Sequence, residues 1–212
     1  DFVVGERTQM PSVVWYKYDG AGWDKHVIDH SRLRPEAGGV CCDVDGDGDQ
    51  DLILGQDASG PEIWWWENPC PDFSQPWTRR LIKRDGPSKH HDQTAADFDG
   101  DGKLDFVSWN QRGKRLLLFE IPEDPRSAGA WTSIPIYTWE SGRELEGFPS
   151  VPVDIDLDGQ VDLVGGGRWF KHSGGKKFEA NLVDDEQRFT QCAAGQLSPG
   201  GRPEIVFSPG DT

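Results

Sequence analysis

Apolar and polar positions alternate in short blocks along the whole chain. Blocks such as VWYKY, IWWWE, LLLFE and RWFKH are rich in β-branched and aromatic residues, and clusters of Gly, Pro, Asn and Asp separate them. This composition and spacing are typical of short β-strands joined by turns. No segment shows a convincing helical period. The pattern therefore predicts an all-β protein.

The apolar blocks belong to a repeat of about fifty residues. One strand of each unit follows an acidic residue, and these residues are 50, 54, 57 and 42 positions apart: Asp1, Asp51, Asp105, Asp162 and Glu204. An aromatic residue recurs in step at Trp23, Trp77, Trp131 and Phe178. A repeat of this length with four short strands is typical of β-propeller blades. We expect residues 1–212 to form a β-propeller of about four blade repeats, each a four-stranded sheet.

Three loops before these strands carry aspartates at alternate positions: residues 43–51 (DVDGDGDQD), 97–105 (DFDGDGKLD) and 154–162 (DIDLDGQVD). Clustered carboxylates repel one another, so a cation is the obvious compensation, although a plain Asp/Gly-rich surface turn is the alternative. Calcium takes several oxygen ligands, including a backbone carbonyl, and uses a glycine for the sharp turn. We expect three Ca²⁺ ions, each bound by positions one, three, five, seven and nine. These residues are Asp43, Asp45, Asp47, Asp49 and Asp51; Asp97, Asp99, Asp101, Lys103 and Asp105; and Asp154, Asp156, Asp158, Gln160 and Asp162.

The pattern DxDxDGxxD followed by a short apolar strand resembles the calcium loops of the FG-GAP and VCBS-type repeat family, which includes the integrin-type β-propeller. The Phe-Gly and Gly-Ala-Pro signatures are not recognisable here, so the bacterial-type VCBS relatives are the closer resemblance. The chain starts at the end of one loop and stops inside a fifth unit, so the resemblance implies a larger propeller, seven-bladed as in the family. A closed four-bladed ring is the alternative.

A fourth loop, residues 196–204, is degenerate. It keeps a glycine and the terminal acid Glu204, but Ser198 and Pro199 stand where carboxylates are needed. Because it has too few oxygen donors, we expect no ion there.

The chain is acidic, with a net charge of −15 over 212 residues, and thirteen acidic side chains lie in the three aspartate loops. The charge argues against a nucleic-acid partner, and no apolar run approaches the length of a membrane span. Weak all-oxygen calcium sites stay empty in the cytosol, so the loops favour a secreted protein, extracellular or periplasmic. Four cysteines permit either disulfides or free thiols: Cys41, Cys42, Cys70 and Cys192.

The family's topology implies a second polar surface, on the face opposite the aspartate loops. Loops that precede the innermost strands would gather there around the axis, and we expect a polyhydroxylated or acidic sugar to bind among them. The candidate residues are Arg34, Lys89, His90, His91, Asp92, Arg143 and Arg188, with Asn110, Gln111, Arg112, Glu144 and Glu146 nearby. For the adjacent histidines the alternative is a structural role, with one buried and one solvated.

These observations leave three hypotheses. The first is a secreted calcium-binding propeller that acts as a binding module for carbohydrate or for an extracellular protein. The second is a polysaccharide lyase or sugar dehydratase that acts on acidic or oxidised sugars, for which a histidine beside an arginine in one pocket is needed. The third is a structural spacer next to the remaining blades or another domain of a longer chain.

Overall fold

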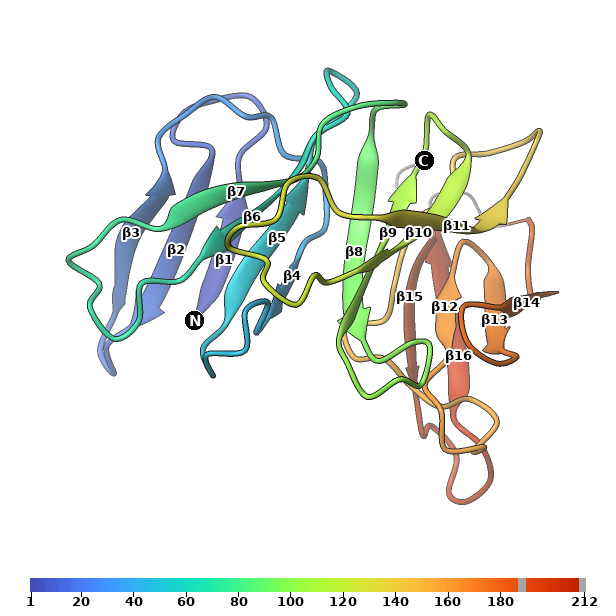
Figure 1. Ribbon diagram of the computed structural model, residues 1–212. Coiled ribbons are helices and arrows are strands. Elements are labelled where there is room, and N and C mark those ends of the chain that lie inside the picture. Colours follow the sequence, from blue (N-terminus) through green and yellow to red (C-terminus); the bar gives the residue numbers. More distant parts are fainter. Residues whose placement is uncertain (187–189, 210–212) are drawn as a thin grey trace.

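The computed structural model describes residues 1–186 and 190–209. Over these residues it contains sixteen strands in five antiparallel sheets that follow one another along the chain (Figure 1). The predicted fold class is confirmed: the protein is all-β and is built from repeated propeller-type sheets. The described residues form no helix that is long and apolar enough to cross a membrane.

Each sheet is a simple meander in which neighbouring strands are consecutive in sequence. The first sheet contains β1 (Phe2–Gly5), β2 (Val13–Tyr18) and β3 (Trp23–Asp29). The second contains β4 (Val40–Cys42), β5 (Asp51–Gly55), β6 (Ile63–Glu67) and β7 (Thr78–Lys83). The third contains β8 (His90–Ala96), β9 (Asp105–Asn110), β10 (Arg115–Glu120) and β11 (Ser133–Thr138). The fourth contains β12 (Leu163–Gly165), β13 (Arg168–His172) and β14 (Phe178–Leu182), and the fifth contains β15 (Thr190–Gly195) and β16 (Glu204–Pro209).

The sheets pack face to face, so both faces of a central strand are covered. In β6, Trp65 lies in the core between the second and third sheets, whereas Trp64 and Trp66 lie in the core between the first and second sheets. This is the alternation of side chains expected of an extended strand, and it explains why all five residues of β5 are buried. The core between the third and fourth sheets contains Trp109 and Phe170.

The first two aspartate loops connect the first and second strands of their sheets, and the third precedes β12, the first strand of the fourth sheet. Residues 43–50 join β4 to β5, and residues 97–104 join β8 to β9. In the fourth sheet an isolated bridge between Val153 and Asp162 flanks the third loop. The β4–β5, β8–β9 and β15–β16 connections all lie at the lower edge of the molecule in Figure 1. The repeat therefore places its acidic loops along one rim.

Backbone hydrogen bonds join neighbouring sheets at the opposite rim. The N–H of His90 donates to the carbonyl of Gln56 at 2.9 Å, and the N–H of Asp92 donates to the carbonyl of Ala37 at 3.0 Å. The chain passes so close here that a Cβ on Gly55 would lie 2.5 Å from the carbonyl oxygen of His90. The loops that precede the innermost strands are thus built into the sheet packing.

Candidate cation sites in the aspartate loops

The first aspartate of each loop shapes the turn. Asp43 Oδ1 accepts hydrogen bonds from the amides of Gly46 (2.8 Å) and Asp47 (3.1 Å), and Oδ2 accepts one from Gly48 (3.0 Å). Asp97 and Asp154 accept corresponding bonds in their own loops. By accepting several amide hydrogens, this carboxylate folds the chain tightly around the loop centre.

The fourth and sixth positions adopt left-handed backbone conformations. Gly46 and Gly48 have φ of 76° and 95°, and the second loop has glycines at the same two positions. In the third loop the fourth position is Leu157, with φ of 62°. Glycine is the residue that adopts this conformation without steric cost, which explains the DGDG pattern of the first two loops.

The acidic residue at position nine links each loop to its sheet. Asp51 is 1% exposed; its Oδ2 accepts the amide of Val44 at 3.0 Å, and its Oδ1 accepts the amide of Asn68 at 2.8 Å. Asp162 makes the same two kinds of contact. In the degenerate loop, Glu204 still accepts the amide of Leu197 at 2.8 Å. The ninth position therefore has a structural role whether or not the rest of the loop is acidic.

In each of the three loops, oxygens of three aspartates lie within 4.8 Å of one another. The groups are Asp43, Asp45 and Asp51; Asp97, Asp99 and Asp101; and Asp154, Asp156 and Asp162. Position nine thus belongs to the group in the first and third loops, and position five belongs to it in the second. Such all-oxygen groups can hold a hard metal ion.

Buried oxygens without partners show that the donors suit a cation. Asp45 Oδ1, Asp49 Oδ1 and Asp156 Oδ1 are buried and accept no hydrogen bond within the described structure. Burial, together with the neighbouring Asp47, Asp45 and Asp43, raises the pKa of Asp49 to about 6. Burial likewise raises the pKa of Asp51 to about 7 and that of Asp105 to about 6. A metal ion among these oxygens would give the unpartnered carboxylate oxygens a partner and would favour the ionised form of the carboxylates.

Three basic side chains contact the acidic loops, and sequence reasoning missed all of them. Arg126 lies against Asp45 and Asp47 of the first loop. Lys171 forms ion pairs with Asp156 and Asp158 of the third loop. Lys176 is 4.0 Å from Asp99 of the second loop and forms a closer pair with Glu120. No local motif marks these residues, because each lies outside the loop that it contacts.

Neighbouring loops also contact each other directly. The side-chain amide of Gln160, at position seven of the third loop, donates to the backbone carbonyl of Asp97 at 2.7 Å. Asp97 is the first residue of the second loop. The second and third loops are therefore hydrogen-bonded to each other.

On the opposite rim, His90 is a structural residue of the sheet packing. It is 0% exposed, and the side-chain amide of Asn110 lies 2.9 Å from its Nε2. Burial lowers the pKa of His90 to about 3, so the ring is neutral at physiological pH. The structural role that the sequence analysis gave as the alternative, with one histidine buried, describes His90.

His91 lies between two carboxylates. Its Nδ1 is 2.8 Å from Asp92 Oδ2, and its Nε2 is 3.5 Å from Glu146 Oε2. Asp92 Oδ2 also accepts the amide of Gly147 at 2.7 Å, and Gln111 donates to Glu146 at 3.0 Å. This half-buried group joins β8 to the segment that precedes the fourth sheet.

Two of the remaining candidate residues on this rim form ion pairs with acidic residues. Lys89 pairs with Glu144, and Arg34 Nε lies 3.1 Å from Asp57 Oδ2. Arg143 lines a separate polar hollow of about 190 Å³. The described residues lining this hollow include Trp139, Arg168 and Asp184 but neither histidine. Arg188 lies outside the described residues.

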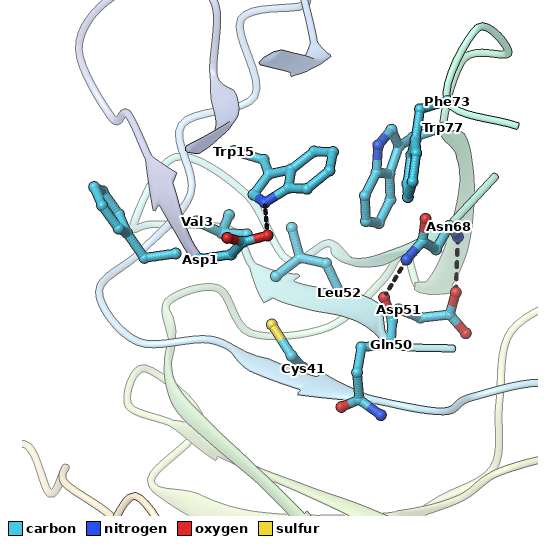
Figure 2. Close-up of a pocket in the computed structure, with 11 residues that line it drawn as sticks. Asp1, Val3, Trp15, Cys41, Gln50, Asp51, Leu52, Asn68, Phe73 and Trp77 are labelled. Atoms are coloured by element: carbon cyan, nitrogen blue, oxygen red, sulfur yellow. Dashed lines mark hydrogen bonds between the residues drawn. The ribbon is translucent and has the colours of Figure 1, made fainter. Parts of the chain in front are cut away.

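A larger hollow of about 410 Å³ opens between the first two sheets, and sequence reasoning did not predict it. Figure 2 shows Trp15 facing Phe73 and Trp77, with Leu52 beneath them. The rings of Trp15 and Phe73 are 5.2 Å apart, so the aromatic side chains pack against each other. The hollow is mainly an apolar groove beside the packed aromatic residues.

The four cysteines are free thiols in this structure. Cys42 is buried, and burial raises its pKa to about 12, as it does for Cys192. These two thiols are therefore protonated at neutral pH and are poor nucleophiles.

The comparisons with known proteins agree with the loop geometry. Residues 43–108 match the family model described as FG-GAP-like repeat. This range begins at the first aspartate loop, includes the second and ends within β9. No curated protein gives a significant match to the chain. Residues 43–108 of the chain are therefore similar to an FG-GAP-like repeat, which agrees with the resemblance of the aspartate loops.

Proposed function

We propose that the chain is a calcium-binding repeat module of a secreted protein, and that three Ca²⁺ ions stabilise the loops 43–51, 97–105 and 154–162. The observation that carries the proposal is the threefold recurrence of aspartate oxygens within 4.8 Å of one another. Buried oxygens without partners in the first and third loops support it. A surface turn that merely tolerates aspartate would have no reason to bring three carboxylates together in every one of the three loops.

The donor chemistry favours calcium among common metals. Every candidate ligand is a carboxylate or carbonyl oxygen, whereas zinc and copper prefer nitrogen and sulfur ligands. Calcium accepts irregular coordination with six to eight oxygens, whereas magnesium demands a near-ideal octahedron. Extracellular calcium is abundant enough to fill weak sites of this kind, which is the support for secretion.

Thermal unfolding in calcium and in chelator tests the proposal. We expect calcium to raise the Tm by several degrees relative to chelator, because an ion that binds only the folded loops stabilises the folded state. Magnesium at the same concentration should have a smaller effect. Asp45→Asn together with Asp99→Asn and Asp156→Asn should abolish most of the calcium response. An unchanged Tm in the wild-type chain would contradict the proposal.

For the biological role we favour binding over catalysis. The hollow lined by Arg143 and Arg168 has Trp139 at its side, and such a combination suits a carboxylate-bearing carbohydrate or an acidic segment of an extracellular protein. The lyase alternative needs a histidine and an arginine in one pocket, and neither histidine lines this hollow among the described residues.

A glycan-binding assay separates the two roles. A binding module should retain acidic oligosaccharides in a salt-sensitive manner and should lose them on Arg143→Ala with Arg168→Ala. A lyase should instead release unsaturated products, and His91→Ala should abolish that release. If the chain neither binds nor cleaves any acidic glycan, a protein partner or a spacer role is favoured.

A further inference from the structure

Arg126 approaches the first aspartate loop from a distant part of the chain. It lies in the connection between β10 and β11 of the third sheet, whereas the loop belongs to the second sheet. Its Nη2 atom is 2.7 Å from Asp45 Oδ2 and 2.9 Å from Asp47 Oδ2. These carboxylates occupy positions three and five of the loop. A guanidinium therefore contacts two predicted cation ligands.

Other contacts hold Arg126 in this position. Its Nε donates to Glu67 Oε1 at 2.8 Å, and its backbone carbonyl accepts a hydrogen bond from Arg80 Nη1 at 2.7 Å. Arg80 also pairs with the other oxygen of Glu67, at 3.0 Å from Nε. The turn beneath Arg126 is closed by hydrogen bonds from Ser127 to Asp124. The contact with the loop is therefore part of an anchored network.

Within this network the carboxylate of Asp45 can still accept a further ligand. Its side chain is 1% exposed, and neither of its oxygens accepts a hydrogen bond within the described structure. One oxygen faces Arg126, and the other has no partner. A divalent cation and Arg126 would thus share one carboxylate. Two positive groups on the same carboxylate repel each other, although the 43% exposure of the arginine side chain weakens the effect through solvent screening.

We propose that Arg126 is an affinity-determining residue of this site: it stabilises loop 43–51 when no cation is bound and thereby weakens the loop's binding of a divalent cation. The inference rests on the proposed function, because it presupposes that the loop binds calcium. Lys171 at Asp156 and Asp158 of the third loop is a second basic side chain in the same relation to positions three and five.

Thermal unfolding of Arg126→Gln in chelator and in saturating calcium tests the inference. The variant should lose more stability in chelator than in calcium. In chelator it leaves the loop carboxylates without the positive charge of Arg126, whereas in calcium the bound ion supplies positive charge in its place. By linkage, its calcium affinity should rise at one site, by roughly three- to ten-fold. Isothermal titration calorimetry measures that change directly. Equal losses in the two buffers, or a larger loss in calcium, would overturn the inference.

Arg79→Gln is the matched control. Arg79 pairs with Asp29 at 2.8 Å and lies in β7 of the same sheet, but it does not contact an aspartate loop. Its removal should cost the same stability in both buffers. Arg126→Lys retains the charge and should respond to calcium much more like the wild type than Arg126→Gln does. If Arg126→Lys and Arg126→Gln behave alike, charge is not the cause and the inference fails.

The wild-type chain separates this inference from the proposed function. If calcium does not stabilise the wild type, the proposed function itself fails. If calcium stabilises the wild type but Arg126→Gln loses stability equally in both buffers, only the role of Arg126 is refuted. Should Arg126→Gln be unfolded in chelator, recovery of its β-sheet circular dichroism on calcium addition would support the inference, and continued unfolding would contradict it.

Discussion

Leu157 is the residue at which the third aspartate loop departs from the other two. It has φ of 62° at a position where the first two loops have glycine, and its side chain is 60% exposed. A left-handed conformation costs a non-glycine residue about 1–2 kcal/mol. The exposed side chain offers little packing in return. The third loop therefore contains a local strain that the sequence alone marks only as a missing glycine.

Leu157→Gly should stabilise the protein. The gain should be about 0.5–1 kcal/mol, because relief of the left-handed strain exceeds the extra entropy that glycine has in the unfolded chain. Urea unfolding in calcium measures the difference. Val151→Gly is the control, since Val151 is 70% exposed and is not among the residues with positive φ, so this change should destabilise slightly. A Leu157→Gly variant less stable than wild type would show that the strain is negligible.

At the scale of the loop, the clustered acids make stability depend on pH when no cation is bound. The folded-state pKa values of Asp49, Asp51 and Asp105 are about 6, 7 and 6, because burial and neighbouring carboxylates raise them. Between about pH 4 and pH 7 the folded chain therefore binds more protons than the unfolded chain. Stability contributed by these groups is present at low pH and is lost as the pH rises.

In chelator, the Tm should accordingly fall by several degrees between pH 5 and pH 7.5. Calcium should flatten or reverse this slope, because the ion favours the ionised carboxylates and lowers their pKa values. Thermal unfolding across the pH range in both buffers measures the effect. Asp49→Asn is the comparison variant and should reduce the slope in chelator. A Tm that rises with pH in chelator would contradict the assignment of these carboxylates as the dominant groups.

At the scale of the whole molecule, neighbouring sheets meet at points with no room for a side chain. A Cβ on Gly55 would lie 2.4 Å from the Cβ and 2.5 Å from the carbonyl oxygen of His90. A Cβ on the corresponding residue of the first sheet, Gly5, would lie 3.2 Å from the side chain of Pro35 and 3.8 Å from that of Leu54. The second and third sheets are therefore in closer contact at this rim than the first and second.

Gly55→Ala should destabilise the protein by about 1–3 kcal/mol, because the methyl group must push the backbone of the third sheet away. Gly5→Ala is the matched control and should cost less, since a proline side chain can shift by a few tenths of an ångström. Urea midpoints of the two variants give the comparison. Equal midpoints would show that the third sheet moves freely relative to the second.

The sequence predicts those features whose parts are contiguous. The aspartate loops could be recognised because their acids and turn glycines lie within nine residues. The side-chain alternation of an extended strand is likewise local, and it places Trp65 on the opposite face from Trp64 and Trp66. Arg126 could not be found in this way, because it is 79 positions from Asp47. His90 and His91 are neighbours in sequence, but only the register of β8 makes the first a core residue and the second a partner of Asp92.

The hydrogen bonds of the acid at position nine bear on how the sequences of such repeats can diverge. Glu204 accepts the Leu197 amide in a loop that has Ser198 and Pro199 in place of ligand positions. Because this contact does not use the positions that Ser198 and Pro199 occupy, a duplicated repeat can exchange the carboxylates at such positions and still keep this turn. Ion binding is then a property that individual copies can lose or regain by point mutation, while the array keeps its architecture.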